Sequence, residues 1–410
     1  MEISMYVVLG LAIMLILFFS FIEPKINRRK IKNDNEYGSA RFATFAEIKK
    51  IFTKEKIINI KETGFPVLYS SDYKFVWFDK QTPHYVYLGS TGSGKSVTAV
   101  IPSCSFIATA KQKRSVFITD PKGEIYHATS KMFKDNGYNV LTIDFRNPEL
   151  SNKFNLLEPI IKEYESYICN ENNGQELIDS IEFLKNNLKV LENEIRSSKV
   201  KANKQKSFVN QNVNNRRGRK RIDYKKLVFE KEKEFENEQI KLKKMTEQQR
   251  VYNNESMKHL AETNRLITSL CTMIMTDKFY QKDPFWNNSA RNLLEGLMGL
   301  FLEEYKSDNI NRNQITLTSI KKFQNSSMEE ENFEKLKNYI EKKEYGTKSK
   351  DSLISILSAS ENTYKSITAV FGEKMSLFDD VNVANITSSS DFDFDVLGRE
   401  PTVLYVIVPD

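Results

Sequence analysis

The chain opens with one long apolar run, Ile3–Ile22, which contains no charged residue. A helix of this length crosses the roughly 30 Å hydrocarbon core of a membrane. A cleaved signal peptide is the alternative, but it would have a basic region before the run, where Glu2 stands, and small residues after it, where Glu23 and Pro24 stand. Basic residues follow instead: Lys25, Arg28, Arg29, Lys30 and Lys32. By the positive-inside rule we expect a single-pass protein of the cell membrane, with the bulk of the chain in the cytoplasm.

Past residue 82, short apolar runs alternate with segments of helical pattern. The runs that predict strands are Tyr85–Leu88, Ser115–Thr119, Asn139–Phe145 and Thr402–Val408. Strand, loop, helix, strand, helix, strand is the order of a doubly wound α/β fold with a mostly parallel sheet. We therefore predict a core domain at residues 83–162, to which residues 376–410 return.

Residues 23–82 form a basic juxtamembrane segment followed by a small β-rich segment. The pattern predicts a helix near Phe45 to Phe52 and strands at Val67–Tyr69 and Phe75–Phe78. These elements would lead into the core domain.

Residues 163–257 are rich in Lys, Glu, Asn and Gln and contain no proline. One apolar stripe at helical spacing comprises Ile178, Ile181, Leu184, Leu188, Leu191 and Ile195. A weaker stripe comprises Leu227, Phe229, Phe235 and Ile240. We predict a charged helical hairpin whose tip, Lys201–Arg221, is basic and disordered. The tip either contacts DNA or anionic lipid, or is a solvated charge run.

Residues 258–375 are mainly helical in pattern. Amphipathic stretches run over His259–Met275, Phe285–Glu304 and Asp351–Phe371. We predict an all-α lobe here.

The residues Gly89 to Ser96 read Gly-Ser-Thr-Gly-Ser-Gly-Lys-Ser and match the P-loop pattern. Glycines let the backbone turn tightly, so that its amides surround a phosphate. Lys95 is placed to reach the β- and γ-phosphates of ATP, and the Ser96 hydroxyl to ligate Mg²⁺. A helix should follow, which Pro102 makes short or kinked. The predicted binding residues are Gly89, Ser90, Thr91, Gly92, Ser93, Gly94, Lys95, Ser96 and Val97. The alternative is a chance Gly/Ser-rich loop.

Asp120 ends an apolar run and opens Asp-Pro-Lys-Gly-Glu, residues 120–124. In a parallel sheet this position lies at the carboxyl edge, where ligands bind. Asp120 then either faces Mg²⁺ or its waters, or caps the next helix from an Asp-Pro turn. Asp144 ends the following strand in the same way.

Composition adds little to this picture. The net charge of +7 is compatible with an acidic partner such as nucleic acid or anionic lipid. Cys104, Cys169 and Cys271 have no metal-ligand spacing, so we expect three reduced thiols, with neither a disulfide framework nor a zinc site.

Several motifs together resemble the TraG-type coupling proteins of conjugative type IV secretion, over nearly the whole chain except residues 163–257. They are Tyr37-Gly38-Ser39-Ala40-Arg41, the loop Gly89 to Ser96, Asp120-Pro121-Lys122-Gly123-Glu124, Phe154-Asn155-Leu156-Leu157, Trp286 with Ala290-Arg291-Asn292-Leu293-Leu294, and Ser390-Asp391-Phe392-Asp393. The resemblance implies a membrane-anchored ATPase with a RecA-like P-loop domain, using ATP and Mg²⁺. It implies a homohexamer that delivers a DNA–relaxase complex to the components of the secretion channel.

The family continues with a strand ending in Asp-Glu, and usually has two membrane helices; residues 1–410 show neither feature. We therefore expect a C-terminally truncated or split chain that binds ATP but hardly hydrolyses it. Asp120 and Glu124 are then the candidate catalytic carboxylates, and Ser96 and Asp120 the candidate metal contacts. The alternatives are an FtsK-type DNA translocase, an ABC-type ATPase, against which the lack of a Leu-Ser-Gly-Gly-Gln-like signature counts, and a catalytically inactive nucleotide-binding membrane scaffold.

Overall fold

The computed structural model describes residues 41, 43–81, 84–90, 92–209, 223–275 and 284–408. The chain divides into two compact units, Met1–Lys113 and Arg114–Asp410. Within the described ranges, no helix is both long enough and apolar enough to cross a membrane. The predicted membrane helix, Ile3–Ile22, lies outside those ranges, as do Tyr37 to Ala40 of the resemblance.

A three-stranded antiparallel sheet with the order β1-β3-β2 forms the basis of the first unit. Its elements are α2 (Phe45–Ile51), β1 (Thr53–Lys56), β2 (Phe65–Tyr69), β3 (Phe75–Asp79), the π-helix η2 (Ser96–Val100) and α3 (Ile101–Thr109). Phe78 of the central strand is fully buried and meets the ring of Phe106 from α3 edge-on at 5.3 Å. The predicted helix and the two predicted strands are confirmed. The pattern missed β1, because its sequence Thr-Lys-Glu-Lys has no apolar face.

The helix α2 begins with a capping box. The Thr44 hydroxyl accepts the Glu47 amide at 3.4 Å, and the Glu47 carboxylate accepts the Thr44 amide at 2.7 Å. Arg41 donates to the same carboxylate at 2.6 Å. The hydrogen bond from Arg41, aided by those from Thr44, lowers the pKa of Glu47 to about 2.

The second unit contains a parallel sheet with the order β4-β6-β5. It consists of β4 (Val116–Thr119), the crossover helix α4 (Glu124–Asp135), β5 (Asn139–Asp144) and β6 (Thr402–Ile407), with the 3₁₀ turn η3 (Pro148–Leu150) after β5. β6 is the middle strand, and its residues Val403, Leu404 and Tyr405 are fully buried. A strand paired on both sides and covered on both faces needs the nearly continuous apolar sequence that predicted it. The mixed α/β architecture with a parallel sheet is thus confirmed.

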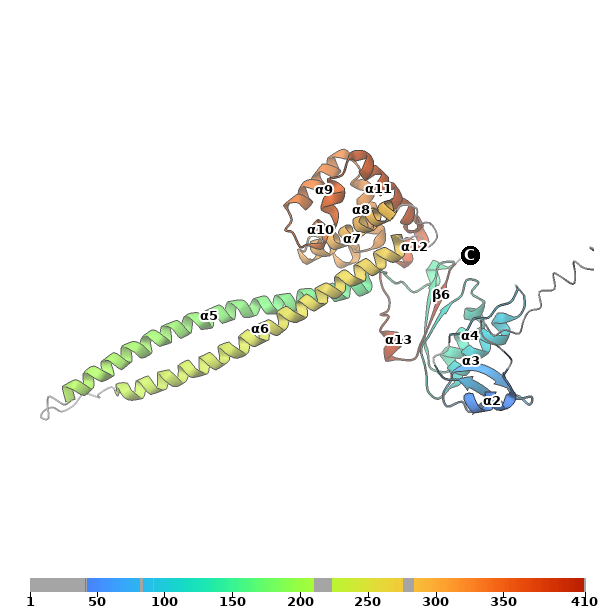
Figure 1. Ribbon diagram of the computed structural model, residues 1–410, viewed down its shortest axis with the longest axis horizontal. Coiled ribbons are helices and arrows are strands. Elements are labelled where there is room, and N and C mark those ends of the chain that lie inside the picture. Colours follow the sequence, from blue (N-terminus) through green and yellow to red (C-terminus); the bar gives the residue numbers. More distant parts are fainter. Residues whose placement is uncertain are drawn as a thin grey trace, which may run out of the picture. The chain divides into compact units, whose positions relative to one another are not determined.

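Two long helices, α5 (Glu158–Val209) and α6 (Tyr224–Met275), run side by side as a hairpin (Figure 1). They are antiparallel, because Glu163 meets His259 at 2.6 Å near the base and Lys199 meets Glu232 at 2.7 Å near the far end. The helical hairpin is as predicted. The predicted disorder of the basic tip was wrong for residues 201–209, because the backbone of α5 stays helical as far as Val209. The rest of the predicted tip, from residue 210, lies outside the described residues.

The seam of this hairpin repeats every seven residues. Its positions on α5 alternate three and four apart: Gly174, Leu177, Ile181, Leu184, Leu188, Leu191, Ile195 and Ser198. This is coiled-coil spacing. The predicted stripes were wrong at three positions. Leu177 occupies the seam in place of Ile178, and Phe229 and Ile240 are 68% and 51% exposed. The reason is that residues on a strict seven-residue repeat face the partner helix, whereas residues one position away from that repeat face solvent.

The lobe is entirely helical in its described residues. It comprises α7 (Pro284–Lys306), η4 (Arg312–Gln314), α8 (Leu317–Ser326), α9 (Glu330–Lys342), α10 (Lys348–Leu357), α11 (Glu361–Lys374), η5 (Ser376–Asp379) and α12 (Val381–Ile386), and the short α13 (Val396–Arg399) precedes β6. α7 approaches α10 closely, since a Cβ built on Gly296 would lie 2.5 Å from Cγ of Leu353. The predicted helical stretch Asp351–Phe371 is two helices, and Ser360 caps the second.

The base of the hairpin belongs to the core of the lobe. Ile161 and Tyr164 of α5 pack there with Ile267, Cys271 and Met275 of α6. Both helices therefore run without interruption through residues 163 and 257, the predicted limits of the insertion.

Candidate functional site

The loop of residues 89–96 precedes the helical segment of the first unit, and all of it except Thr91 is described. Gly92 and Gly94 have φ values of 80° and 81°, which residues with a Cβ rarely adopt. Ser93 donates its amide to the Ser90 carbonyl at 3.2 Å, and the amide and hydroxyl of Thr98 both bond the Gly94 carbonyl at 2.8 Å. The glycines at these positions are therefore required by the backbone.

The ammonium group of Lys95 is folded back onto this loop. Its Nζ donates to the carbonyl oxygens of Gly89 at 2.6 Å and Ser90 at 2.9 Å. A cation is thus held against the glycine-rich backbone, where it can attract an anion. Ser96 and Val97, the last of the predicted binding residues, lie in the first turn of the following helix.

The helix after the loop is irregular where Pro102 occurs. Residues Ser96–Val100 form a π-helix, in which the Ile101 amide bonds the Ser96 carbonyl, and α3 continues from Ile101 with Pro102 in its first turn. Because proline has no amide hydrogen, it cannot make the regular bond to the preceding turn. The predicted perturbation by Pro102 is confirmed as a π-helical turn.

The run ahead of the loop is not a strand, contrary to the prediction. Tyr85 stacks on Phe65 of β2 with ring centroids 3.5 Å apart, and Tyr87 lies 5.6 Å from the same ring. Val86 and Leu88, on the opposite side, are 83% and 92% exposed. The alternation typical of a strand is present, but aromatic packing replaces a hydrogen-bonded ladder within the first unit.

Asp120 acts as a helix cap in the second unit. Its side chain is 1% exposed, and Oδ2 accepts the Tyr126 amide in the first turn of α4 at 2.9 Å. Its own amide bonds the Val406 carbonyl at 2.9 Å, which attaches the turn to β6. The structure thus shows the contact that the capping interpretation predicts, and the metal contact of Asp120 stays a prediction. Glu124 is the exposed first residue of α4.

Asp144 stabilises a turn in a similar way. Its Oδ1 accepts the amides of Arg146 at 2.8 Å and Asn147 at 3.1 Å. Carboxylates at the ends of both outer strands therefore bind the backbone. Among the residues the structure describes, no three His, Cys, Asp or Glu side chains are grouped to hold a metal ion.

The buried thiols are poor candidates for chemistry. Cys104 and Cys271 are free and buried, and burial raises the pKa of Cys104 to about 11. Because the thiolate is the nucleophile, both groups are inert near neutral pH.

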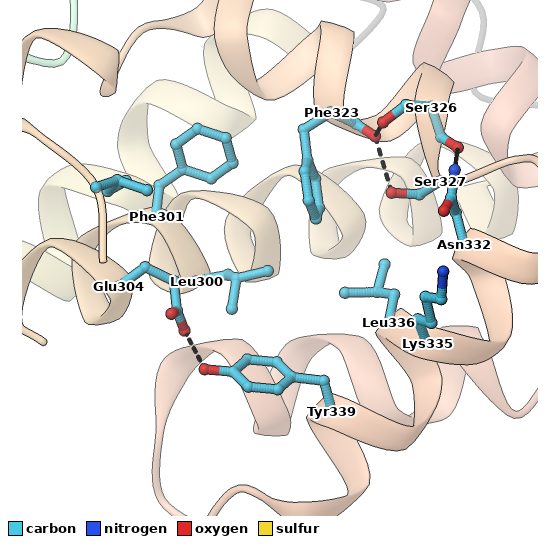
Figure 2. A pocket seen from close by; sticks show the side chains of 11 residues that line it. Leu300, Phe301, Glu304, Phe323, Ser326, Ser327, Asn332, Lys335, Leu336 and Tyr339 are labelled. Carbon is cyan, nitrogen blue, oxygen red and sulfur yellow. Dashed lines mark hydrogen bonds between the residues drawn. The ribbon is translucent and has the colours of Figure 1, made fainter. Parts of the chain in front are cut away.

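The lobe contains an apolar cavity of about 500 Å³ between α7, α8 and α9, which the sequence did not indicate (Figure 2). Phe301 and Phe323 line it together with aliphatic side chains. Its polar groups are satisfied internally: Tyr339 donates to Glu304 at 2.6 Å, and the Ser327 hydroxyl donates to the Phe323 carbonyl at 2.8 Å (Figure 2). The cavity therefore offers mainly apolar contact.

Taken together, the parallel sheet, the helical lobe and the glycine-rich loop with its lysine define an α/β protein with a candidate anion-binding loop. The chain belongs to the family of type IV secretory system conjugative DNA transfer proteins, whose family model matches residues 38–410. This membership confirms the resemblance to TraG-type coupling proteins and indicates a coupling role in secretion. No curated protein matches the chain.

Proposed function

We propose that this protein is an ATP-binding coupling protein, anchored in the cell membrane by Ile3–Ile22, that delivers a DNA–relaxase complex to the channel of a conjugative type IV secretion system. Family membership supports the coupling role. The conformation of the loop supports nucleotide binding, and the observation that carries it is the position of Lys95 against the carbonyls of Gly89 and Ser90.

The residues of the loop fit a nucleoside triphosphate with its magnesium ion. Phosphate oxygens can replace the two carbonyls as acceptors for Lys95, and a charge-assisted bond to phosphate is stronger than one to a neutral carbonyl. The backbone around Gly92 and Gly94 stays open to the ligand, and a Cβ on Gly89 would lie 2.6 Å from Oγ of Ser93. In this proposal the Ser96 hydroxyl holds Mg²⁺, and ATP supplies the free energy for transport. Asp120 and Glu124 are the carboxylates to be tested for a part in hydrolysis.

The test is ATP binding to the full chain, measured by calorimetry in the presence of Mg²⁺. Hydrogen bonds to charged groups contribute about 1.5–3 kcal/mol, so Lys95→Ala should weaken binding roughly 10- to 100-fold. Lys111→Ala is the matched control, because Lys111 is an exposed lysine of the same unit outside the loop. Equal affinity of parent and Lys95→Ala would refute the assignment of the loop.

A further inference from the structure

A groove of about 580 Å³ lies between one face of α4 and the outer edge of β5. Its α4 side carries Tyr126, Ser130 and Lys134, each four residues after the last, with Lys131 beside them. None of the described residues that line the groove is an acid. The charged side chains in the lining are therefore all positive.

Lys131 and Lys134 give the groove its positive charge. Both are exposed, and neither forms an ion pair with a residue in the described part of the chain. Residues three apart on a helix are neighbours on its surface, so the two ammonium groups can act on one ligand. Glu400 accepts a hydrogen bond from the side-chain amide of Asn139 at 3.1 Å, and Asp135 and Glu149 adjoin lining residues in the sequence, so acids lie beside the groove but not in its lining.

The far side of the groove is a strand edge that is only partly closed. Thr142 donates its amide to Oδ1 of Asn152 at 3.0 Å, and Asp144 donates its amide to Oγ of Ser151 at 2.9 Å, so the following segment covers the edge there. Asn139 donates toward β6, and because successive residues of a strand alternate, Val140 directs its amide to the open edge instead. An amide, a hydroxyl and two ammonium groups, all of them hydrogen-bond donors, thus border the same space.

We propose that this groove binds the phosphodiester backbone of a transferred DNA strand. A set of donors without a carboxylate is complementary to phosphate oxygens. Tyr126, whose ring meets Tyr405 edge-on at 5.2 Å, adds aromatic surface of the kind on which bases stack. The proposal rests on the proposed function for its choice of DNA over other phosphates, because the family acts in conjugative DNA transfer.

The experiment measures binding of fluorescein-labelled oligothymidine to the full chain in mild detergent, by fluorescence anisotropy over a series of salt concentrations. Lys131→Glu combined with Lys134→Glu should weaken binding about tenfold or more. It should also reduce the slope of log K against log salt by about 1.4, which is about 0.7 for each lost phosphate contact of a single strand. Lys322→Glu combined with Lys342→Glu is the matched control, since these lysines are exposed on α8 and α9 and line none of the cavities described here.

Unchanged oligothymidine binding by the groove variant, or an equal loss in the control, would overturn the proposal. Phosphatidylglycerol vesicles and inorganic phosphate test the other phosphate sources. If vesicle binding needs these lysines while oligothymidine binding does not, the groove is a lipid site and the proposal fails. ATP binding separates the two proposals: the groove variant should bind ATP like the parent, and Lys95→Ala should keep its affinity for oligothymidine. A parent that binds oligothymidine through the groove but does not bind ATP would refute the nucleotide assignment alone.

Discussion

The two roles considered for Asp120, helix cap and magnesium contact, predict different effects of the same substitutions. Its buried carboxylate accepts the Tyr126 amide at 2.9 Å, at the positive end of the α4 dipole. Removing a cap costs about 0.5–2 kcal/mol, and losing a bond to a buried charged group about 1.5–3 kcal/mol. Asp120→Ala should therefore destabilise the second unit by about 2–3 kcal/mol. Asp120→Asn keeps an oxygen acceptor and should cost about 1 kcal/mol or less.

The assay is urea unfolding followed by circular dichroism, with and without Mg²⁺ and ATP. If Asp120 is a cap alone, both variants are less stable than the parent, and Asp120→Ala loses more stability than Asp120→Asn. The additional stability conferred by Mg·ATP is then the same in both variants as in the parent. Asp135→Asn, an exposed acid at the other end of α4, is the control and should leave the unfolding midpoint nearly unchanged.

A different outcome would refute this reasoning. If Asp120→Asn is as stable as the parent but gains no stability from Mg·ATP, the carboxylate contacts the metal or its waters, and its bond to Tyr126 is incidental. If both variants unfold at the parent's midpoint, the observed hydrogen bond contributes nothing measurable.

Three further predictions concern other parts of the chain. A cysteine placed at Lys32 should resist a membrane-impermeant thiol reagent in intact cells, since the basic cluster is expected on the cytoplasmic side, and labelling would reverse the proposed topology. Replacing Gln175–Gln249 by a short Gly-Ser linker should leave the lobe folded, because the core of the lobe uses only the base of the hairpin. By contrast, Ile267→Ala removes a buried side chain of that core and should cost about 2–5 kcal/mol of stability. Thermal melting of both variants, followed by circular dichroism, checks this. The contribution of Glu47 to stability should be complete above its ordinary pKa of 4.5 and be lost as the pH falls through about 2, because its pKa is lowered in the folded state. NMR titration of Glu47 in Arg41→Ala should show the pKa moving back up, and an unchanged pKa would show that Arg41 is not the main cause.

Much of the local structure could be predicted because it depends on short-range periodicity. The long helices of the hairpin follow from apolar residues three and four apart, and β6 follows from an unbroken apolar run. The register of the seam could not be predicted as well, since Leu177 and Ile178 both fit a helical stripe. Only packing against α6 placed Leu177 on the seam and left Ile178 37% exposed.

In the candidate site, too, the local sequence determined some features and tertiary packing determined others. The glycine spacing in residues 89–96 by itself determined that the backbone there adopts conformations rare for other residues, and Pro102 by itself required an irregular helix. What tertiary structure decided are the partners that come from distant segments. The Tyr85–Leu88 run has the composition of a strand, but its aromatic rings pack on Phe65. The sheet order β4-β6-β5 places the last strand between two early ones, and the Val406 carbonyl of that strand holds the amide of Asp120. Periodicity records which face of an element is buried, whereas the neighbour that buries it depends on pairings across hundreds of residues that no local pattern encodes.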